Sequence, residues 1–175
     1  MNKEKTNRVL EYFDELFPDA YCELNHESDF QLLVAVMLSA QTTDKKVNQL
    51  TENLFKKYPT VEAVSQASLP ELEQDIKTIG LYRNKAKNLL ALSHVLIEQF
   101  DGIVPSDQKQ LESLPGVGRK TANVVRSVAF DIPAFAVDTH VERISKRLGF
   151  AKRDDNVLTV EKKLCRSIPR NRWNK

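Results

Sequence analysis

The chain has 175 residues, of which 41% are hydrophobic and 29% charged, and its 26 basic and 24 acidic side chains give a formal net charge of +2. This is the composition of an ordinary folded protein, and its length suits one large domain or two small lobes. It excludes a membrane-spanning protein, because no apolar run is long enough, and the polar N-terminus MNKEKTNRV is neither a signal peptide nor an anchor. The charge balance alone does not indicate nucleic-acid binding.

Apolar residues at three- and four-residue spacing predict helices from the start of the chain. The first helix covers residues 9–17 and is ended by Pro18. Ser28 and Gln31 have the spacing of a capping box, in which each side chain accepts a hydrogen bond from the other's backbone. The helix that follows, through residues 30–38, is apolar almost all round and is therefore expected to be buried.

Capping residues mark the next helices. Asp44 is predicted to cap one helix, and Thr60 and Ser68 are predicted to cap two more, with Glu71 completing a capping box at Ser68. The helix after Ser68 is expected to stop at Gly80. The remaining predicted helices cover residues 86–100, 105–114, 119–130, 138–148 and 158–168.

These elements amount to about ten short helices joined by tight turns, and no segment alternates with the period of a strand. An all-α fold is therefore predicted. The segment Gly80-Leu-Tyr-Arg-Asn-Lys-Ala86 also matches Gly116-Val-Gly-Arg-Lys-Thr-Ala122 in its glycine, arginine and alanine. Two copies of a helix-hairpin-helix unit would explain this match, and chance is the alternative.

The most informative segment is Leu114–Ala122, with the sequence LPGVGRKTA. Gly116 and Gly118 allow a sharp turn and leave room for a phosphate. The helix that begins just after them presents unpaired N–H groups and a positive dipole end, which favour an anion. Val117 is expected to plug the turn onto the core. An ordinary interhelical turn with a glycine cap is the alternative.

The motifs LPGVGRKTANVV and AVDTHVERI, with Asp138 eighteen residues after Lys120, resemble the helix-hairpin-helix DNA glycosylases, and within them the endonuclease III branch. The resemblance extends to ELNHESDFQLLVAVMLSAQTTD and KTIGLYRNKAKN and covers nearly the whole chain. It implies two helical lobes with a DNA groove between them. Their expected limits are residues 22–132, a helical barrel domain with the hairpin, and residues 1–21 plus 133–175, a second lobe incomplete at its C-terminus.

The resemblance also implies an activity: excision of oxidised or saturated pyrimidines from duplex DNA, followed by strand cleavage through β-elimination. It assigns the nucleophile to Lys120 and the essential carboxylate to Asp138, and it places Gln41 and Leu81 in the gap left by a flipped base. The full set of predicted DNA-binding residues is Gln41, Leu81, Arg83, Lys85, Gly116, Val117, Gly118, Arg119, Thr121 and Arg143. For the basic side chains among them, a solvated surface is the alternative to phosphate contacts.

The chemistry explains why these residue types are needed. A glycosidic bond breaks through a cation-like sugar, so a nucleophile at C1′ and a nearby negative charge both help. A lysine nucleophile must be neutral, whereas free lysine has a pKa of about 10.4. The helix N-terminus disfavours the ammonium form of Lys120, and burial would act in the same direction, whereas the negative charge of Asp138 favours it. Asp138 is expected to be both a helix cap and a catalyst, and His140 beside it to be structural.

The chain departs from the family near its C-terminus. Most members carry four closely spaced cysteines that hold a [4Fe–4S] cluster, whereas this chain has only Cys22 and Cys165, far apart. These two fit no metal or disulfide pattern, so reduced thiols in a cytoplasmic protein are expected, with no cofactor ligated by this chain. Without the C-terminal segment we expect exposed apolar surface, lowered stability and weaker DNA affinity.

The sequence therefore leaves three hypotheses for the function. The first is a glycosylase and lyase that acts, as a monomer, on double-stranded DNA with a damaged base or an abasic site. The second is a DNA-binding helix-hairpin-helix module without full catalysis. The third is an adenine or mismatch glycosylase of the same fold. Lys120 argues against the third, because those relatives generally lack the lysine.

Overall fold

The computed structural model describes residues 2–174, and within that range it contains ten α-helices, one short 3-10 helix and no strand. The predicted all-α fold is confirmed. None of the helices in this range is long and apolar enough to cross a membrane. The chain divides into two compact units, Met1–Cys22 with Arg126–Lys175 (unit 1) and Glu23–Val125 (unit 2). The lobe limits expected from the sequence stay a prediction.

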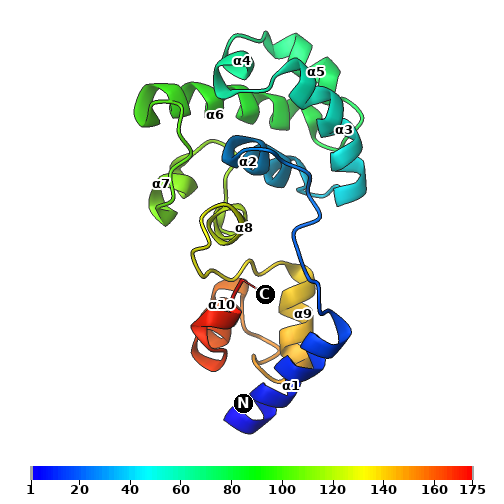
Figure 1. The fold of residues 1–175 in the computed structure, drawn as a ribbon, viewed down its shortest axis with the longest axis vertical. Coiled ribbons are helices and arrows are strands. Elements are labelled where there is room, and N and C mark those ends of the chain that lie inside the picture. Colours follow the sequence, from blue (N-terminus) through cyan, green and yellow to red (C-terminus); the bar gives the residue numbers. More distant parts are fainter. Residues whose placement is uncertain (1, 175) are drawn as a thin grey trace. The chain divides into compact units, whose positions relative to one another are not determined.

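Unit 2 is built around a buried helix. Every residue of α2 (Asp29–Leu38) from Phe30 onward is buried, as its apolar sequence predicted. α2 packs against α3 (Asp44–Lys57) and α6 (Tyr82–Phe100), and α6 in turn carries α4 (Val61–Ser65) and α5 (Leu69–Ile76), as Figure 1 shows. Two shorter elements complete the hairpin region: α7 (Gln108–Ser113) and α8 (Arg119–Ala129), whose last residues pass into unit 1.

Most of the predicted caps are confirmed. Thr60 accepts a hydrogen bond from Ala63 N, and Ser68 with Glu71 forms a complete capping box. Ser28 also caps α2, but the Gln31 side chain accepts from Glu27 N rather than from Ser28 N. The predicted capping box at that site is therefore only half formed.

Three predicted helix limits are wrong by a few residues. Asp44 is the first residue of α3 and not its cap, because the preceding Thr43 is the last extended residue. Its carboxylate still favours the positive end of the helix dipole. α5 ends at Ile76, well before Gly80. α7 begins after Asp107, whose carboxylate accepts from two backbone N–H groups, and not at Ser106.

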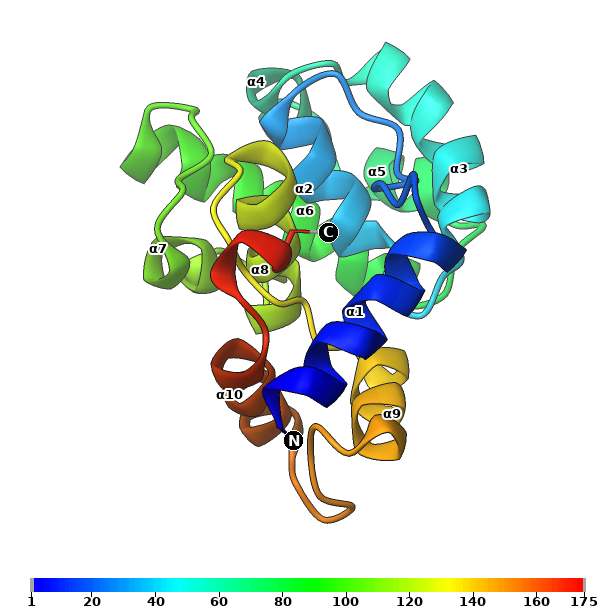
Figure 2. The same cartoon turned by 60° about the horizontal axis from the view of Figure 1, so that its bottom comes forward.

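Unit 1 contains α1 (Lys3–Leu16), α9 (Thr139–Leu148), α10 (Val157–Ser167) and a 3-10 turn at Arg170–Arg172, which can be followed in Figure 2. Its core is formed by the buried residues Val137, Phe150, Ala151, Val160 and Leu164. Arg172 and Trp173 connect the end of the described chain to α1 and to the segment after α10. Arg172 donates two hydrogen bonds of 2.7 Å to the Asp14 carboxylate, and Trp173 donates one to Ile168 O at 2.9 Å.

Helices α1 and α10 both expose apolar side chains, as the sequence predicted. The exposed large apolar residues on them are Tyr12, Phe13, Leu16, Val157 and Leu158, with Phe17 and Tyr21 just after α1. The effect of this surface on stability stays a prediction.

Candidate active site

The glycine turn between α7 and α8 is fixed by close packing on one side. Gly116 has φ +76°, and a Cβ placed there would lie 2.8 Å from Asn88 Cβ and 3.0 Å from Met37 Sδ. Only glycine fits this combination of dihedral angle and contact. Val117 is buried, with its N–H donating to Leu114 O at 3.1 Å. The predicted plug is confirmed, so Val117 holds the turn and does not itself reach outward.

The other side of the same turn is open. At Gly118 a Cβ would meet none of the described residues within 4 Å, and its φ is ordinary. Gly118 O accepts the hydrogen bond from Ala122 N at 2.9 Å that begins α8. A bare backbone at the positive end of a helix is the arrangement that lets a phosphate come close.

Lys120 lies in the first turn of α8 and is exposed, directly after this turn. Its neighbour Arg119 is also exposed, and its guanidinium nitrogen lies 3.5 Å from a carboxylate oxygen of Glu112 on α7. Thr121 is half-buried. Lys120 and Arg119 thus follow the glycine turn directly, as exposed residues of the first turn of α8.

The two residues expected to fill the gap of a flipped base share an unusual backbone conformation. Gln41 has φ +56° and Leu81 has φ +59°, in the left-handed region that larger side chains seldom adopt. Both are exposed, and the Leu81 side chain stays 55% exposed although it is apolar. Strained, exposed residues of this kind cluster at functional sites. We refer to Gln41 and Leu81 as the wedge residues.

The prediction that Lys85 contacts DNA phosphate does not fit the structure. Lys85 is only 5% exposed, and its ammonium donates hydrogen bonds to Leu38 O, Ala40 O and Thr42 Oγ1 at 2.9, 2.7 and 3.1 Å. Burial lowers the pKa of this ammonium. The sequence could not show this role, because the acceptors lie more than forty residues away. Arg83, by contrast, is exposed, with its guanidinium over the Tyr82 ring.

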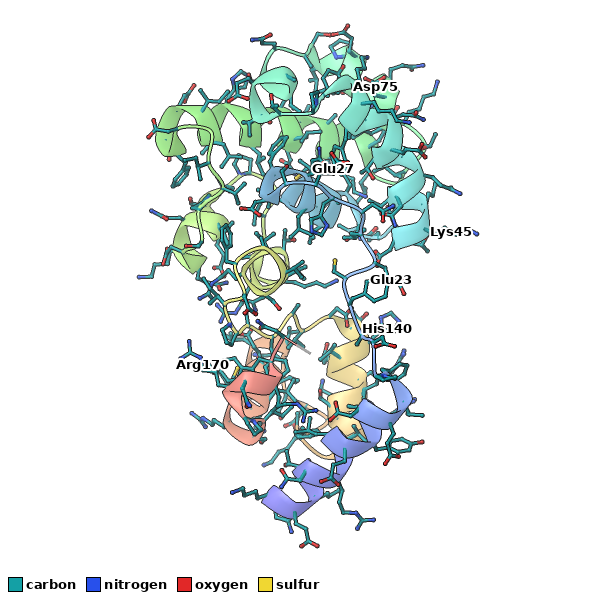
Figure 3. The ribbon with its side chains drawn as sticks, in the orientation of Figure 1. Glu23, Glu27, Lys45, Asp75, His140 and Arg170 are labelled. Atoms are coloured by element: carbon teal, nitrogen blue, oxygen red, sulfur yellow. The ribbon has the colours of Figure 1, made fainter. Side chains whose placement is uncertain are left out.

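In unit 1, Asp138 caps α9 as predicted, and its catalytic role stays a prediction. Its Oδ1 accepts from His140 N at 2.9 Å and from Val141 N at 2.8 Å, which begins α9. Its Oδ2 lies 3.9 Å from Nδ1 of His140, beyond hydrogen-bond distance. His140 points out from the first turn of α9, where Figure 3 labels it. The cap holds the carboxylate in one orientation.

Arg143 lies further along α9 in an open, basic depression. The depression is lined by Thr139, Glu142, Arg143, Lys146, Arg147 and Arg153. Lys146 is paired with Glu142 at 2.6 Å, which leaves the guanidinium groups to dominate its charge. The sequence analysis singled out only Arg143; Lys146 and Arg147 follow it at helical spacing on α9, whereas Arg153 comes from the loop after the helix.

The described residues do not fit an iron–sulfur cluster. Such a cluster takes four cysteine thiolates, and this chain offers Cys22 and Cys165 alone. No group of three or more histidine, cysteine or acidic side chains within residues 2–174 is arranged to hold a metal ion.

Comparisons with known proteins agree with these features. Residues 34–170 match the HhH-GPD superfamily of base excision DNA repair proteins. The chain is 55% identical to endonuclease III of Bacillus subtilis over 174 residues, which is 99% of this chain and 80% of that protein. A second relative, endonuclease III of Escherichia coli K12, is 46% identical over 169 residues, 97% of this chain and 80% of that protein.

A solved structure leads to the same family. The fold resembles that of a trapped endonuclease III–DNA covalent intermediate, with a TM-score of 0.96, 55% identity and coverage of 99% of this chain and 82% of that one. The chain therefore belongs to the HhH-GPD superfamily of base excision DNA repair proteins.

Proposed function

We propose that this protein excises oxidised or saturated pyrimidines from duplex DNA and then cleaves the strand at the abasic site. Its family and relatives identify it as a DNA glycosylase with AP lyase activity. The observation that carries the assignment of residues is the position of Lys120, exposed in the first turn of α8 directly after the glycine turn. A solved relative forms a covalent intermediate with DNA, which supports a nucleophile on the protein.

In the proposed reaction the neutral amine of Lys120 attacks C1′ of the damaged nucleotide. A C–N bond forms, and the glycosidic bond breaks with its electron pair passing to the base. Asp138 stabilises the positive charge on the sugar and accepts the proton that the amine releases. The nitrogen lone pair then forms the C=N bond of an iminium as the C1′–O4′ bond breaks, and the ring oxygen takes the proton back from Asp138 to become a hydroxyl.

The iminium accounts for strand cleavage. It withdraws electrons and makes a C2′ proton acidic, so loss of that proton expels the 3′ phosphate with the electron pair of its C–O bond. The hairpin contributes to both steps by holding the DNA backbone, because the N-terminus of a helix binds phosphate without reading the base sequence. We expect the protein to act in the cytoplasm as a monomer on damaged double-stranded DNA.

The direct test is reductive trapping. Sodium borohydride converts the proposed iminium into a stable link between protein and abasic duplex. We expect the wild-type chain and the control Lys56→Ala, which removes an exposed lysine of α3, to form this link, and Lys120→Ala to form none. Trapping of Lys120→Ala at the wild-type level would reject Lys120 as nucleophile. Binding without trapping by the wild-type chain would instead support the non-catalytic DNA-binding module.

Asp138 can be tested without disturbing the fold. An asparagine carbonyl can still accept from His140 N and Val141 N, so Asp138→Asn should keep the cap and the thermal midpoint. We expect its single-turnover excision rate to fall by about 100-fold or more, because the negative charge and proton acceptor are both lost. Excision of thymine glycol near the wild-type rate would reject the role.

A further inference from the structure

Lys85 stands out because it is a buried cation with three partners in one short segment. Its ammonium donates to Leu38 O and Ala40 O, and to the hydroxyl of Thr42, all within 3.1 Å. Leu38 is the last residue of α2, where the backbone carbonyls form the negative end of the helix dipole. The ammonium therefore completes the C-terminus of α2 and also extends to the residues beyond it.

Those residues form a tight turn around Gln41. Thr42 N donates to Ser39 O at 3.0 Å, which closes a four-residue turn with Gln41 at its third position. Gln41 holds φ +56° there, at a place where glycine or asparagine is usual. Two of the three acceptors of Lys85, Ala40 and Thr42, are the residues on either side of Gln41. The ammonium thus fixes both flanks of a strained residue and leaves its side chain exposed.

The backbone of Lys85 is joined to the second wedge residue. Lys85 N donates to Leu81 O at 3.0 Å, the hydrogen bond that begins α6. Leu81 has φ +59° and no side-chain cap bond is formed there. A single residue is therefore bonded through its main chain to Leu81 and through its side chain to the neighbours of Gln41. The two wedge residues come from segments forty positions apart, and Lys85 connects these segments through Leu81 and through the neighbours of Gln41.

We propose that Lys85 is a positioning residue that sets Gln41 and Leu81 at a fixed spacing, so that both enter the DNA duplex at a lesion as one preformed unit. This inference rests on the proposed function and names no new contact with DNA. A preformed wedge loses little conformational entropy when it displaces a base pair.

The residue type suits this task. An ammonium has three donors arranged around one point, and here they meet three acceptors, whereas the planar guanidinium of arginine has a different geometry. Methionine has a similar length but no donor, so Lys85→Met leaves the carbonyl oxygens of Leu38 and Ala40 without this donor. Lys87, two residues along α6, is exposed and provides the matched control Lys87→Met.

The inference predicts which step is sensitive. Excision from an intact base pair requires the wedge, because breaking and unstacking the pair costs free energy. Attack on a preformed abasic site has no base pair to break. We therefore expect Lys85→Met to lower the single-turnover excision rate on thymine glycol duplex by about tenfold, since it removes hydrogen bonds to a charged group. Borohydride trapping on abasic duplex should change by no more than about twofold. Lys87→Met should alter neither.

Two further variants separate positioning from simple loss of structure. If Lys85 acts through Gln41, the double variant Lys85→Met with Gln41→Ala should excise no more slowly than Lys85→Met alone, whereas independent roles would multiply the two losses. Thr42→Val removes only one acceptor and should give a smaller loss in the same direction. If circular dichroism and thermal unfolding show that Lys85→Met does not fold, excision and trapping are compared in Thr42→Val instead.

A fluorescent base gives a reading of the wedge itself. With 2-aminopurine opposite the lesion, unstacking raises the fluorescence when protein binds, and Lys85→Met should lose most of this rise while still binding. Equal losses of excision and trapping in Lys85→Met, or multiplied losses in the double variant, would overturn the inference. Absence of trapping in the wild-type chain would instead contradict the proposed function.

Discussion

Two helix-turn-helix segments share one sequence register but expose different parts of their turns. In α5–α6 and α7–α8 the second helix buries the matched alanine, Ala86 or Ala122, completely. The turns differ. The first has its positive φ at Leu81 and exposes that side chain, whereas the second has it at Gly116 and buries Val117 at the position that matches Leu81. One turn therefore presents a side chain, and the other removes side chains so that the backbone itself is accessible.

The two segments therefore share a sequence register and a buried alanine but differ in the conformation of the turn. The left-handed residue lies one position earlier in the second hairpin, and the residue after the matched glycine is exposed in the first hairpin and buried in the second. An exposed leucine can enter a base stack, and an exposed backbone can bind a phosphate. Under the proposed function, the first hairpin would displace a base and the second would bind the strand next to Lys120.

The strongest test of this difference is a methyl group at each of the matched glycines. Gly116→Ala puts a Cβ 2.8 Å from Asn88 Cβ at φ +76°, and we expect the free energy of unfolding to fall by about 3 kcal/mol. Gly80→Ala meets no described residue within 4 Å and has an ordinary φ, so it should change stability little. Urea unfolding of both variants measures this. Equal losses would show that the two turns are not different in packing.

A smaller effect is expected at Gly118, and on binding instead of stability. A Cβ at Gly118 meets nothing in the protein, so Gly118→Ala should keep the thermal midpoint. It would stand where a phosphate approaches, and we expect affinity for abasic duplex to fall about tenfold through weaker hydrogen bonds to a charged group. Fluorescence anisotropy at a fixed salt concentration measures the affinity. Unchanged affinity would show that phosphate does not approach the turn at Gly118.

At Leu81, in the first hairpin, we expect stability and activity to respond differently to the same substitution. Leu81→Gly relieves a left-handed conformation but gains flexibility when unfolded, so we expect the free energy of unfolding to stay the same or rise by roughly 0.5 kcal/mol. Excision of thymine glycol should fall about fivefold, because the wedge loses a side chain. Leu81→Ala, which keeps the strained backbone, should lose excision without the gain in stability. A fall in stability for Leu81→Gly would contradict the strain.

The smallest effect is a pH dependence at the start of the first hairpin. The hydroxyl and the backbone N–H of Ser68 donate to the Glu71 carboxylate, which holds the pKa of Glu71 below its ordinary value of 4.5. The unfolded chain therefore binds the proton more readily, so this stabilisation is present above pH 4.5 and is lost as pH falls through the folded pKa.

Glu71→Gln tests this dependence, since glutamine can still complete the capping box but cannot titrate. Thermal unfolding at pH 7 and at lower pH should show a small advantage of the wild-type chain that shrinks on acidification. An advantage that grows as the pH falls would contradict the sign of the shift.

Local sequence was enough to predict most of the helices, the glycine turn and the cap at Asp138. The buried α2, the caps at Thr60, Ser68 and Asp138, and the glycine turn before Lys120 all depend on contacts within a few residues. The helix limits predicted at Asp44 and Gly80 were wrong. Where a helix begins or ends also depends on the path that the neighbouring chain takes, which local sequence does not determine. The catalytic roles of Lys120 and Asp138 came from the resemblance to the family.

The sequence alone determined that this is a helical protein of a DNA repair family, with an amine at the start of one helix and a carboxylate capping another. The helices and their caps follow from hydrophobic spacing, glycine and short-range hydrogen bonds, whereas the family follows from the resemblance of its motifs. Only the tertiary structure decided that Lys85 is buried and bonded to the end of α2, and that Gly116 packs against Asn88 and Met37. The reason is physical: a lysine or a glycine takes its role from the groups that folding brings beside it, and here those groups lie from 28 to 79 residues away along the chain.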